Sequence, residues 1–155
     1  MKPNVKKLLI CLAIPLAIGG LASLLVGGYQ DFQQVVQPPL SPPGWVFPVV
    51  WSILYLLMGY ASYRVLTSGK EPELVRKALI AYGVQLALNF LWPLFFFGAN
   101  WYLAAFVLLI GRWAAIYITM RKFSQLDQVA GDLLLPYILW VCFAGYLNLG
   151  VYLLN

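Results

Sequence analysis

Apolar residues fall into five long runs along the chain, and short polar segments separate them. Each run is close to 20 residues long, which at about 1.5 Å of helical rise per residue is enough to cross the hydrocarbon core of a bilayer. The pattern therefore predicts an all-α integral membrane protein, a five-transmembrane-helix bundle in which 1–155 form one domain. The predicted helices cover approximately 8–28, 47–66, 79–97, 101–120 and 133–154.

The linkers between the runs predict how the helices are joined. The segment 98–100 is so short that the third and fourth helices must form an antiparallel hairpin. The segment 67–78 predicts a polar turn, and Gly131 with Asp132 is typical of a start for the fifth helix. The proline-rich segment 29–46 is expected to be an outward-facing loop over the pocket, stiffened by its prolines.

The distribution of positive charge predicts the topology. Nine of the ten Lys and Arg residues lie in or beside the N-terminus, 67–78 and 121–132, and the tenth, Arg112, lies within the fourth apolar run. The segments expected on the other side, 29–46, 98–100 and the C-terminus, hold none. The positive-inside rule then places the N-terminus in the cytoplasm and the C-terminus outside, in the cell membrane. The first apolar run is too long for a typical signal sequence, so we expect it to be a retained helix.

Composition narrows the functional classes. With 63% apolar and 10% charged residues, the chain is typical of a membrane protein, and its net charge of +5 does not indicate nucleic acid as a partner. The absence of histidine excludes a histidine-based catalytic triad or zinc site. Cys11 and Cys142 lie in apolar runs and are expected to be small buried side chains. No activated nucleophile or metal-ligand cluster is evident, so no cofactor is required and conventional enzyme chemistry is not expected.

Four polar side chains inside the predicted spans are candidates for function, because such groups are costly in lipid. They are Gln85, Asn89, Arg112 and Asn148. Three interpretations of Arg112 are open: the guanidinium extends toward the membrane surface, it pairs with a ligand carboxylate, or it reaches Asp132 at the start of the fifth helix.

Aromatic residues recur at helical spacing around these polar positions. One stripe joins Trp51 to Tyr55, a second joins Asn89 to Trp92 and Phe96, and a third begins at Trp140. We expect these stripes to face one another in the bundle. The pattern therefore predicts a cavity with walls of indole and phenol rings. The alternative is that they are ordinary packing stripes and aromatic residues of the membrane interface.

Small residues recur at every fourth position in two helices, as Gly19, Ser23 and Gly27 and as Gly83 and Ala87. Such faces allow close helix contacts, either inside the bundle or across a homodimer.

Three ordered motifs resemble those of a known family. They are QPPLSPPGWVFPVVWSILYLLMGYASYRV, GVQLALNFLWPLFFFG and LLLPYILWVCFAGYLN, which together reach from the predicted loop to the fifth helix. The chain resembles the translocator protein (TSPO), or tryptophan-rich sensory protein, family along essentially its whole length.

The resemblance implies a five-helix bundle that dimerises and binds porphyrins, and also sterols and benzodiazepine-site drugs, in its outward half. The implied ligand-binding residues are Trp51, Asn89, Trp92, Trp140, Ala144, Leu147 and Asn148, with Tyr55, Phe90 and Ala105 added by neighbourhood. The chain departs from the family pattern at Gln37 and Leu40, and no Lys or Arg follows Tyr152, where the family's sterol motif has one.

The resemblance favours a membrane receptor or sensor that binds tetrapyrroles and similar flat hydrophobic ligands. One alternative is light-dependent porphyrin degradation that uses Trp51 and Trp140, since an indole beside a photoexcited porphyrin can donate an electron. Another is a transporter of porphyrin-type or sterol-type ligands. In every case the lipid bilayer is the environment and the ligand is a small hydrophobic molecule.

Overall fold

The computed structural model describes residues 4–26 and 36–155, and in these ranges the chain is helical without strands. Five helical segments are long and apolar enough to cross a membrane, so the predicted all-α fold with five spans is confirmed. The elements are α1 (Val5–Val26), α2 (Val46–Leu66), α3 (Pro72–Pro93), the π-helical turn η2 (Leu94–Gly98), α4 (Tyr102–Leu126), α5 (Gln128–Leu133) and α6 (Leu135–Leu154).

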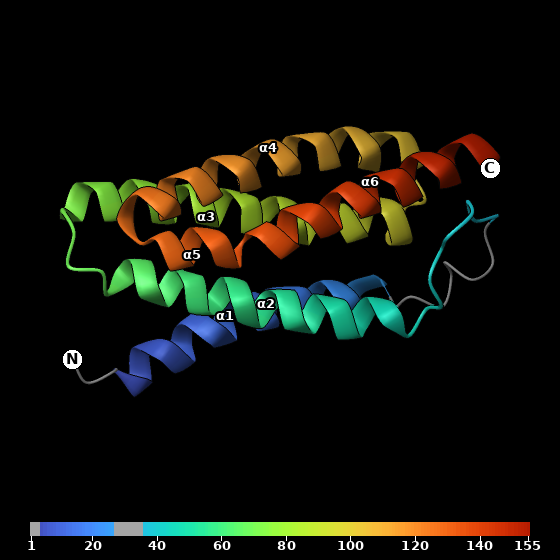
Figure 1. Cartoon of the computed structure of the whole chain (residues 1–155). Helices are drawn as coiled ribbons and strands as arrows, with labels where there is room; N and C mark the ends of the chain where they lie inside the picture. Colours follow the sequence, from blue (N-terminus) through green and yellow to red (C-terminus); the bar gives the residue numbers. More distant parts are fainter. Residues whose placement is uncertain (1–3, 27–35) are drawn as a thin grey trace.

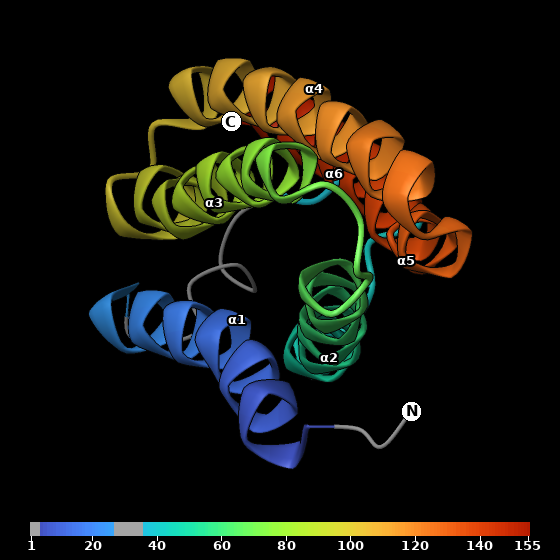
Figure 2. The same ribbon diagram turned by 90° about the vertical axis from the view of Figure 1, so that its left-hand side faces the viewer.

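The helices lie side by side as an elongated bundle (Figure 1). Viewed along its axis, α3 and α4 form a neighbouring pair, as the short link between them predicts, while α1 and α2 form a second pair (Figure 2). The helix α6 packs on α4, and α5 reaches across to α2. Much of α1 remains on the outside of the bundle.

Two helices are longer than predicted at the same end of the bundle. The helix α3 begins at Pro72 rather than at residue 79, with the proline at its first turn, where a missing N–H costs least. The helix α4 continues to Leu126 rather than ending at residue 120, because Phe123 and Leu126 are buried and extend the packed face. The predicted polar turns are therefore largely helical.

The fifth span does not start as predicted. It consists of α5 and α6, which meet at Leu134, and Pro136 in the first turn of α6 cannot donate a backbone hydrogen bond. The N-cap of α5 is Asp127, whose Oδ1 accepts from Ala130 N–H at 3.1 Å. The prediction of a start at Gly131 and Asp132 was wrong: Gly131 lies inside α5, where a Cβ atom would meet the Ser124 side chain.

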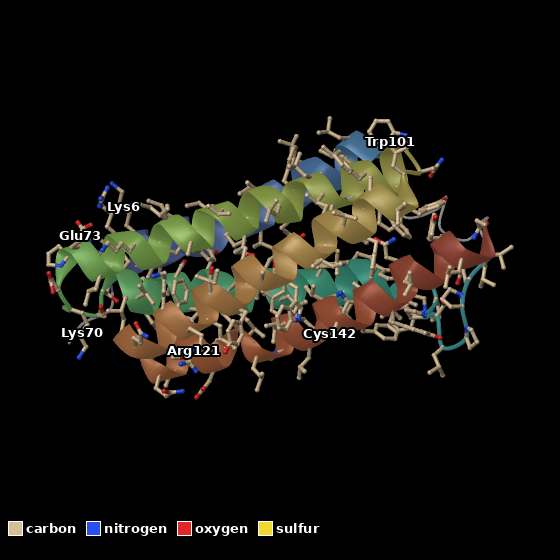
Figure 3. The ribbon with its side chains drawn as sticks, turned by 90° about the horizontal axis from the view of Figure 1, so that it is seen from above. Lys6, Lys70, Glu73, Trp101, Arg121 and Cys142 are labelled. Atoms are coloured by element: carbon tan, nitrogen blue, oxygen red, sulfur yellow. The ribbon has the colours of Figure 1, made fainter. Side chains whose placement is uncertain are left out.

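The charged side chains gather at one end of the bundle, as their distribution along the sequence predicts. Lys6, Lys70, Glu73 and Arg121 lie at one end and Trp101 lies at the other (Figure 3). The ion pair Arg64–Asp127, at 3.2 Å, joins α2 to the start of α5 at the charged end. Figure 3 also shows Cys142 midway along the bundle; it is exposed, so the expectation that both cysteines are buried holds only for Cys11.

The described part of the proline-rich loop packs against the end of α6. Tyr146 O–H donates to the Pro39 carbonyl oxygen at 2.6 Å, and the Asn155 side chain pairs with the backbone of Val36. Pro38 is buried against Gly150, where a Cβ atom would lie only 2.5 Å from the proline ring. Residues 29–35 of this loop, together with Gly27, lie outside the described ranges.

Candidate functional site

Three helices meet around a small cavity in the half of the bundle nearer to the proline-rich loop. We call this cavity the aromatic chamber. Its lining consists of Phe47, Trp51, Trp92, Phe96, Phe97, Trp140, Ala144, Leu147 and Asn148. The first two belong to α2, the next three to α3 and η2, and the rest to α6.

The chamber is closed by its own side chains. The Trp92 and Phe96 rings stack with their centroids 5.0 Å apart, and Phe97 meets Phe96 edge-on at 4.8 Å. Trp140 stands perpendicular to Trp51 at 6.4 Å. The cavity volume is about 20 Å³, which is room for about one water molecule. Because pockets for drug-sized ligands are typically ~300–1,000 Å³, a flat ligand enters this chamber only when rings move.

Asn148 fixes the geometry of the chamber. Its Oδ1 accepts from Trp92 Nε1–H at 3.0 Å, and its Nδ2–H donates to the Tyr102 carbonyl oxygen at 2.8 Å. The amide thus links α3, α4 and α6, and it is completely buried. By contrast, Trp140 Nε1–H is buried and has no hydrogen-bond acceptor among the described residues.

Behind Trp51 lies a polar layer, which we call the arginine cluster: Arg112, Asn89, Tyr137 and Gln85. Arg112 Nη2–H donates to Asn89 Oδ1 and to the Tyr137 hydroxyl oxygen, the latter at 3.3 Å. Tyr137 O–H in turn donates to Gln85 Oε1 at 2.7 Å. All four side chains are buried, and Arg112 is 0% exposed.

Two interpretations of Arg112 are wrong in this structure. The guanidinium does not extend toward the membrane surface, since it is completely buried. Arg112 lies roughly 15 Å from the Tyr102 end of α4 and roughly 21 Å from the Leu126 end, at about 1.5 Å of rise per residue. Nor does it reach Asp132, which is exposed and accepts from Gln128 instead at 2.9 Å. The pairing with a ligand carboxylate is the interpretation that remains.

The structure brings six of the ten predicted ligand-binding residues to the chamber wall. They are Trp51, Trp92, Trp140, Ala144, Leu147 and Asn148. Asn89 lies one layer deeper in the arginine cluster, and its Nδ2–H donates to the Tyr55 hydroxyl oxygen at 3.3 Å. Tyr55 stacks on Trp51 at 5.7 Å from outside the lining, and neither Phe90 nor Ala105 is part of the wall.

Three site residues, Phe47, Phe97 and Tyr137, were missed as candidates. Phe47 lies one helical turn before Trp51, so its spacing was a usable signal. Phe97 reaches the chamber through the π-helical turn that follows Pro93, which spacing does not predict, whereas Phe96 in the same turn lies on the predicted stripe of Asn89 and Trp92. Tyr137 of α6 contacts Arg112 of α4, and no local sequence pattern connects residues on different helices.

An apolar groove lies outside the chamber, between α2 and α6. Its volume is about 460 Å³, and its lining is Val50, Ile53, Leu54, Leu57, Pro136, Leu139, Trp140 and Phe143. Trp140 also lines the chamber, so this indole is shared by the inner cavity and the outer groove.

Known proteins match the chain over most or all of its length. The model of the TspO/MBR family matches residues 11–154. The "Tryptophan-rich protein TspO" of Chlorobaculum tepidum is 35% identical, over 100% of this chain and 99% of its own length. The "Tryptophan-rich sensory protein" of Cereibacter sphaeroides is 38% identical over 80% of this chain and 76% of its own, and the "Translocator protein" of Ovis aries is 40% identical over 78% and 72%. With five apolar spans and these matches, the chain is a multi-pass membrane protein that belongs to the TspO/MBR family.

Proposed function

We propose that this protein is a membrane receptor that binds tetrapyrroles and similar flat hydrophobic ligands in the aromatic chamber. The observation that carries the proposal is the wall of three indoles and three phenyl rings contributed by separate helices. Flat aromatic ligands gain most from such walls, through stacking and edge-on contacts with the rings. The word "sensory" in the name of the Cereibacter sphaeroides relative is consistent with a receptor.

The shared position of Trp140 supports a hydrophobic ligand that arrives from the bilayer. The outer groove is almost entirely apolar and lies on a surface that faces lipid in a membrane protein. Rotation of the Trp140 side chain joins this groove to the chamber and adds the space that the closed chamber lacks. A ligand dissolved in lipid can follow this path without crossing water.

Binding can be tested with protoporphyrin IX in the dark. Titration into purified protein is expected to quench tryptophan fluorescence saturably at micromolar ligand, because chamber indoles lie beside the bound ring. Ala144→Phe fills the chamber and is expected to weaken binding at least about tenfold. Leu149→Phe, a similar enlargement on the exposed face of α6, is the matched control. Absence of saturable quenching in the wild-type protein would contradict the proposal.

A second function is favoured by the contact between Trp51 and Trp140. Their ring centroids are 6.4 Å apart and both line the chamber, so either indole can donate an electron to a photoexcited porphyrin. Illumination of the dark-titrated sample should then cause protein-dependent loss of porphyrin absorption. Trp51→Phe and Trp140→Phe should keep binding and lose this bleaching. Bleaching at the same rate without protein would eliminate this second function.

The proposal also covers the orientation of the protein in the cell membrane and its oligomeric state. Cations at one end of the bundle favour a cell membrane orientation with that end, and the N-terminus, in the cytoplasm (Figure 3). A homodimer is supported by Gly83 and Ala87, which lie on an exposed face of α3 with open space beside Gly83. Gly19 instead serves packing inside the bundle, since a Cβ atom there would meet the Tyr55 ring.

A further inference from the structure

Arg112 is a buried charge without a described counter-charge. A guanidinium remains ionised in proteins, and a charge inside a bundle is costly unless it is paired. In the ranges 4–26 and 36–155, the chain has four side-chain carboxylates: Glu71, Glu73, Asp127 and Asp132. All four belong to the charged end, and the two ion pairs among the described residues use other arginines.

The guanidinium is also incompletely hydrogen-bonded. Both of its acceptors, Asn89 Oδ1 and the Tyr137 hydroxyl oxygen, are neutral and both are bonded to Nη2. Nε–H and Nη1–H are buried and have no acceptor in the described part of the chain. Unpaired donors on a buried cation are rare, and each adds to the cost of burying it. An anion at this position would supply both the missing charge and the missing acceptors.

Trp51 occupies the place between Arg112 and the aromatic chamber. The guanidinium carbon lies 4.8 Å from the centre of the Trp51 ring system, within the range of a cation–π contact. Trp51 is also a wall of the chamber. A cation–π contact stabilises a guanidinium less than a charge-assisted hydrogen bond to a carboxylate does, so an acid group can displace the indole.

We infer that the ligand of the aromatic chamber carries a carboxylate and that Arg112 is its charge partner. The flat ring of the ligand lies between the chamber walls, while the acid group moves Trp51 aside and accepts from the free N–H groups of Arg112. The inference rests on the proposed function, because it specifies the chemical class of that ligand. Asn89 and Tyr137 are positioning residues, since they hold Nη2 and leave the other nitrogens for the ligand.

The test compares protoporphyrin IX, which has two carboxylic acids, with its dimethyl ester, which has none. The wild-type protein is expected to bind the acid at least about tenfold more tightly at neutral pH. Arg112→Met should lower affinity for the acid to that for the ester and leave the ester affinity within about threefold. Arg121→Gln removes an exposed positive charge from the same helix and is the matched control; it should preserve the preference.

Oleate distinguishes the source of the carboxylate. If a fatty acid supplies the same chemistry, equimolar oleate displaces protoporphyrin from the wild-type protein. That result would overturn the inference that the carboxylate belongs to a ligand with a flat ring. No displacement supports it. Equal wild-type binding of acid and ester would overturn the inference and leave the proposed function intact, whereas binding of neither would contradict both. The wild-type comparison decides the question even if Arg112→Met fails to fold.

Discussion

The aromatic chamber and the arginine cluster lie back to back on the two sides of Trp51, and they are built on opposite principles. The chamber contains no charge, and its one buried amide, Asn148, uses both its oxygen and its nitrogen in hydrogen bonds. The cluster contains a full charge, and its partners in the described part of the chain are neutral acceptors and ring faces. Packing is close in both regions, but the chamber leaves a neutral donor, Trp140 Nε1–H, without an acceptor among the described residues, whereas the cluster leaves two donors of a charged group without one.

The difference in charge determines how each region can respond to a ligand. Rings of the chamber can rearrange around a ligand at modest cost, because no charge is uncovered and each ring exchanges packing against its neighbours for packing against the ligand. The arginine cluster cannot rearrange so freely, because every alternative position for the guanidinium must also supply hydrogen bonds. We therefore expect the chamber to adapt its shape and the cluster to select the charge of the ligand.

The largest effect is expected from Trp51→Ala, because this residue belongs to both regions. The change removes a chamber wall and the ring that covers Arg112, and it should lower the free energy of unfolding by about 3–5 kcal/mol. Unfolding of purified protein in detergent, followed by circular dichroism, measures the effect. Trp45→Ala is the control, since Trp45 is 68% exposed at the start of the same helix. Similar losses for the two variants would mean that Trp51 does not join the regions.

The next largest effect on the free energy of unfolding distinguishes the two buried asparagines, Asn89 and Asn148. Asn89→Ala leaves Arg112 without its closest acceptor and should cost about 2–3 kcal/mol of unfolding free energy. Once Arg112→Met has removed the charge, the same change should cost less than about 1 kcal/mol, the size of an ordinary neutral hydrogen bond. Arg112→Met alone is expected to be neutral or stabilising, because a buried unpaired charge gives way to an apolar side chain of similar length.

Asn148→Ala is the control for this cycle, because its partners are Trp92 and Tyr102 and not Arg112. Its cost should be the same with and without Arg112→Met. A coupling between Arg112 and Asn148 as large as that between Arg112 and Asn89 would show that the two regions act as one network.

Much of this fold could be predicted from the sequence, because an apolar run of about 20 residues has few other stable solutions. The ends of α3 and α4 could not. Outside the hydrocarbon, helix ends depend on tertiary contacts such as the Arg64–Asp127 pair and the burial of Phe123, and local hydropathy does not report these. For the same reason the polar turn expected at 67–78 is mostly the first turns of α3.

The candidate site shows the same limit. Residues such as Trp140 and Ala144 could be grouped from the sequence, since a spacing of four places them on one helical face. The partners of Arg112 could not, because Asn89 and Tyr137 come from two other helices and meet the guanidinium only after the bundle forms. Even with the spans known, the sequence does not indicate whether an arginine in mid-helix faces lipid or the bundle interior.

The smallest effect concerns the two indole N–H groups of the chamber. Trp92→Phe and Trp140→Phe remove the same atoms, but of the two N–H groups only that of Trp92 has an acceptor among the described residues, Asn148. Trp92→Phe should therefore cost about 1 kcal/mol more in unfolding free energy, a size typical of a hydrogen bond between membrane helices. Repeating both substitutions in an Asn148→Ala background should remove the difference, because the acceptor is then absent. If the difference persists there, it comes from ring packing around Trp92, and the chamber owes its shape to stacking rather than to the amide that links its helices.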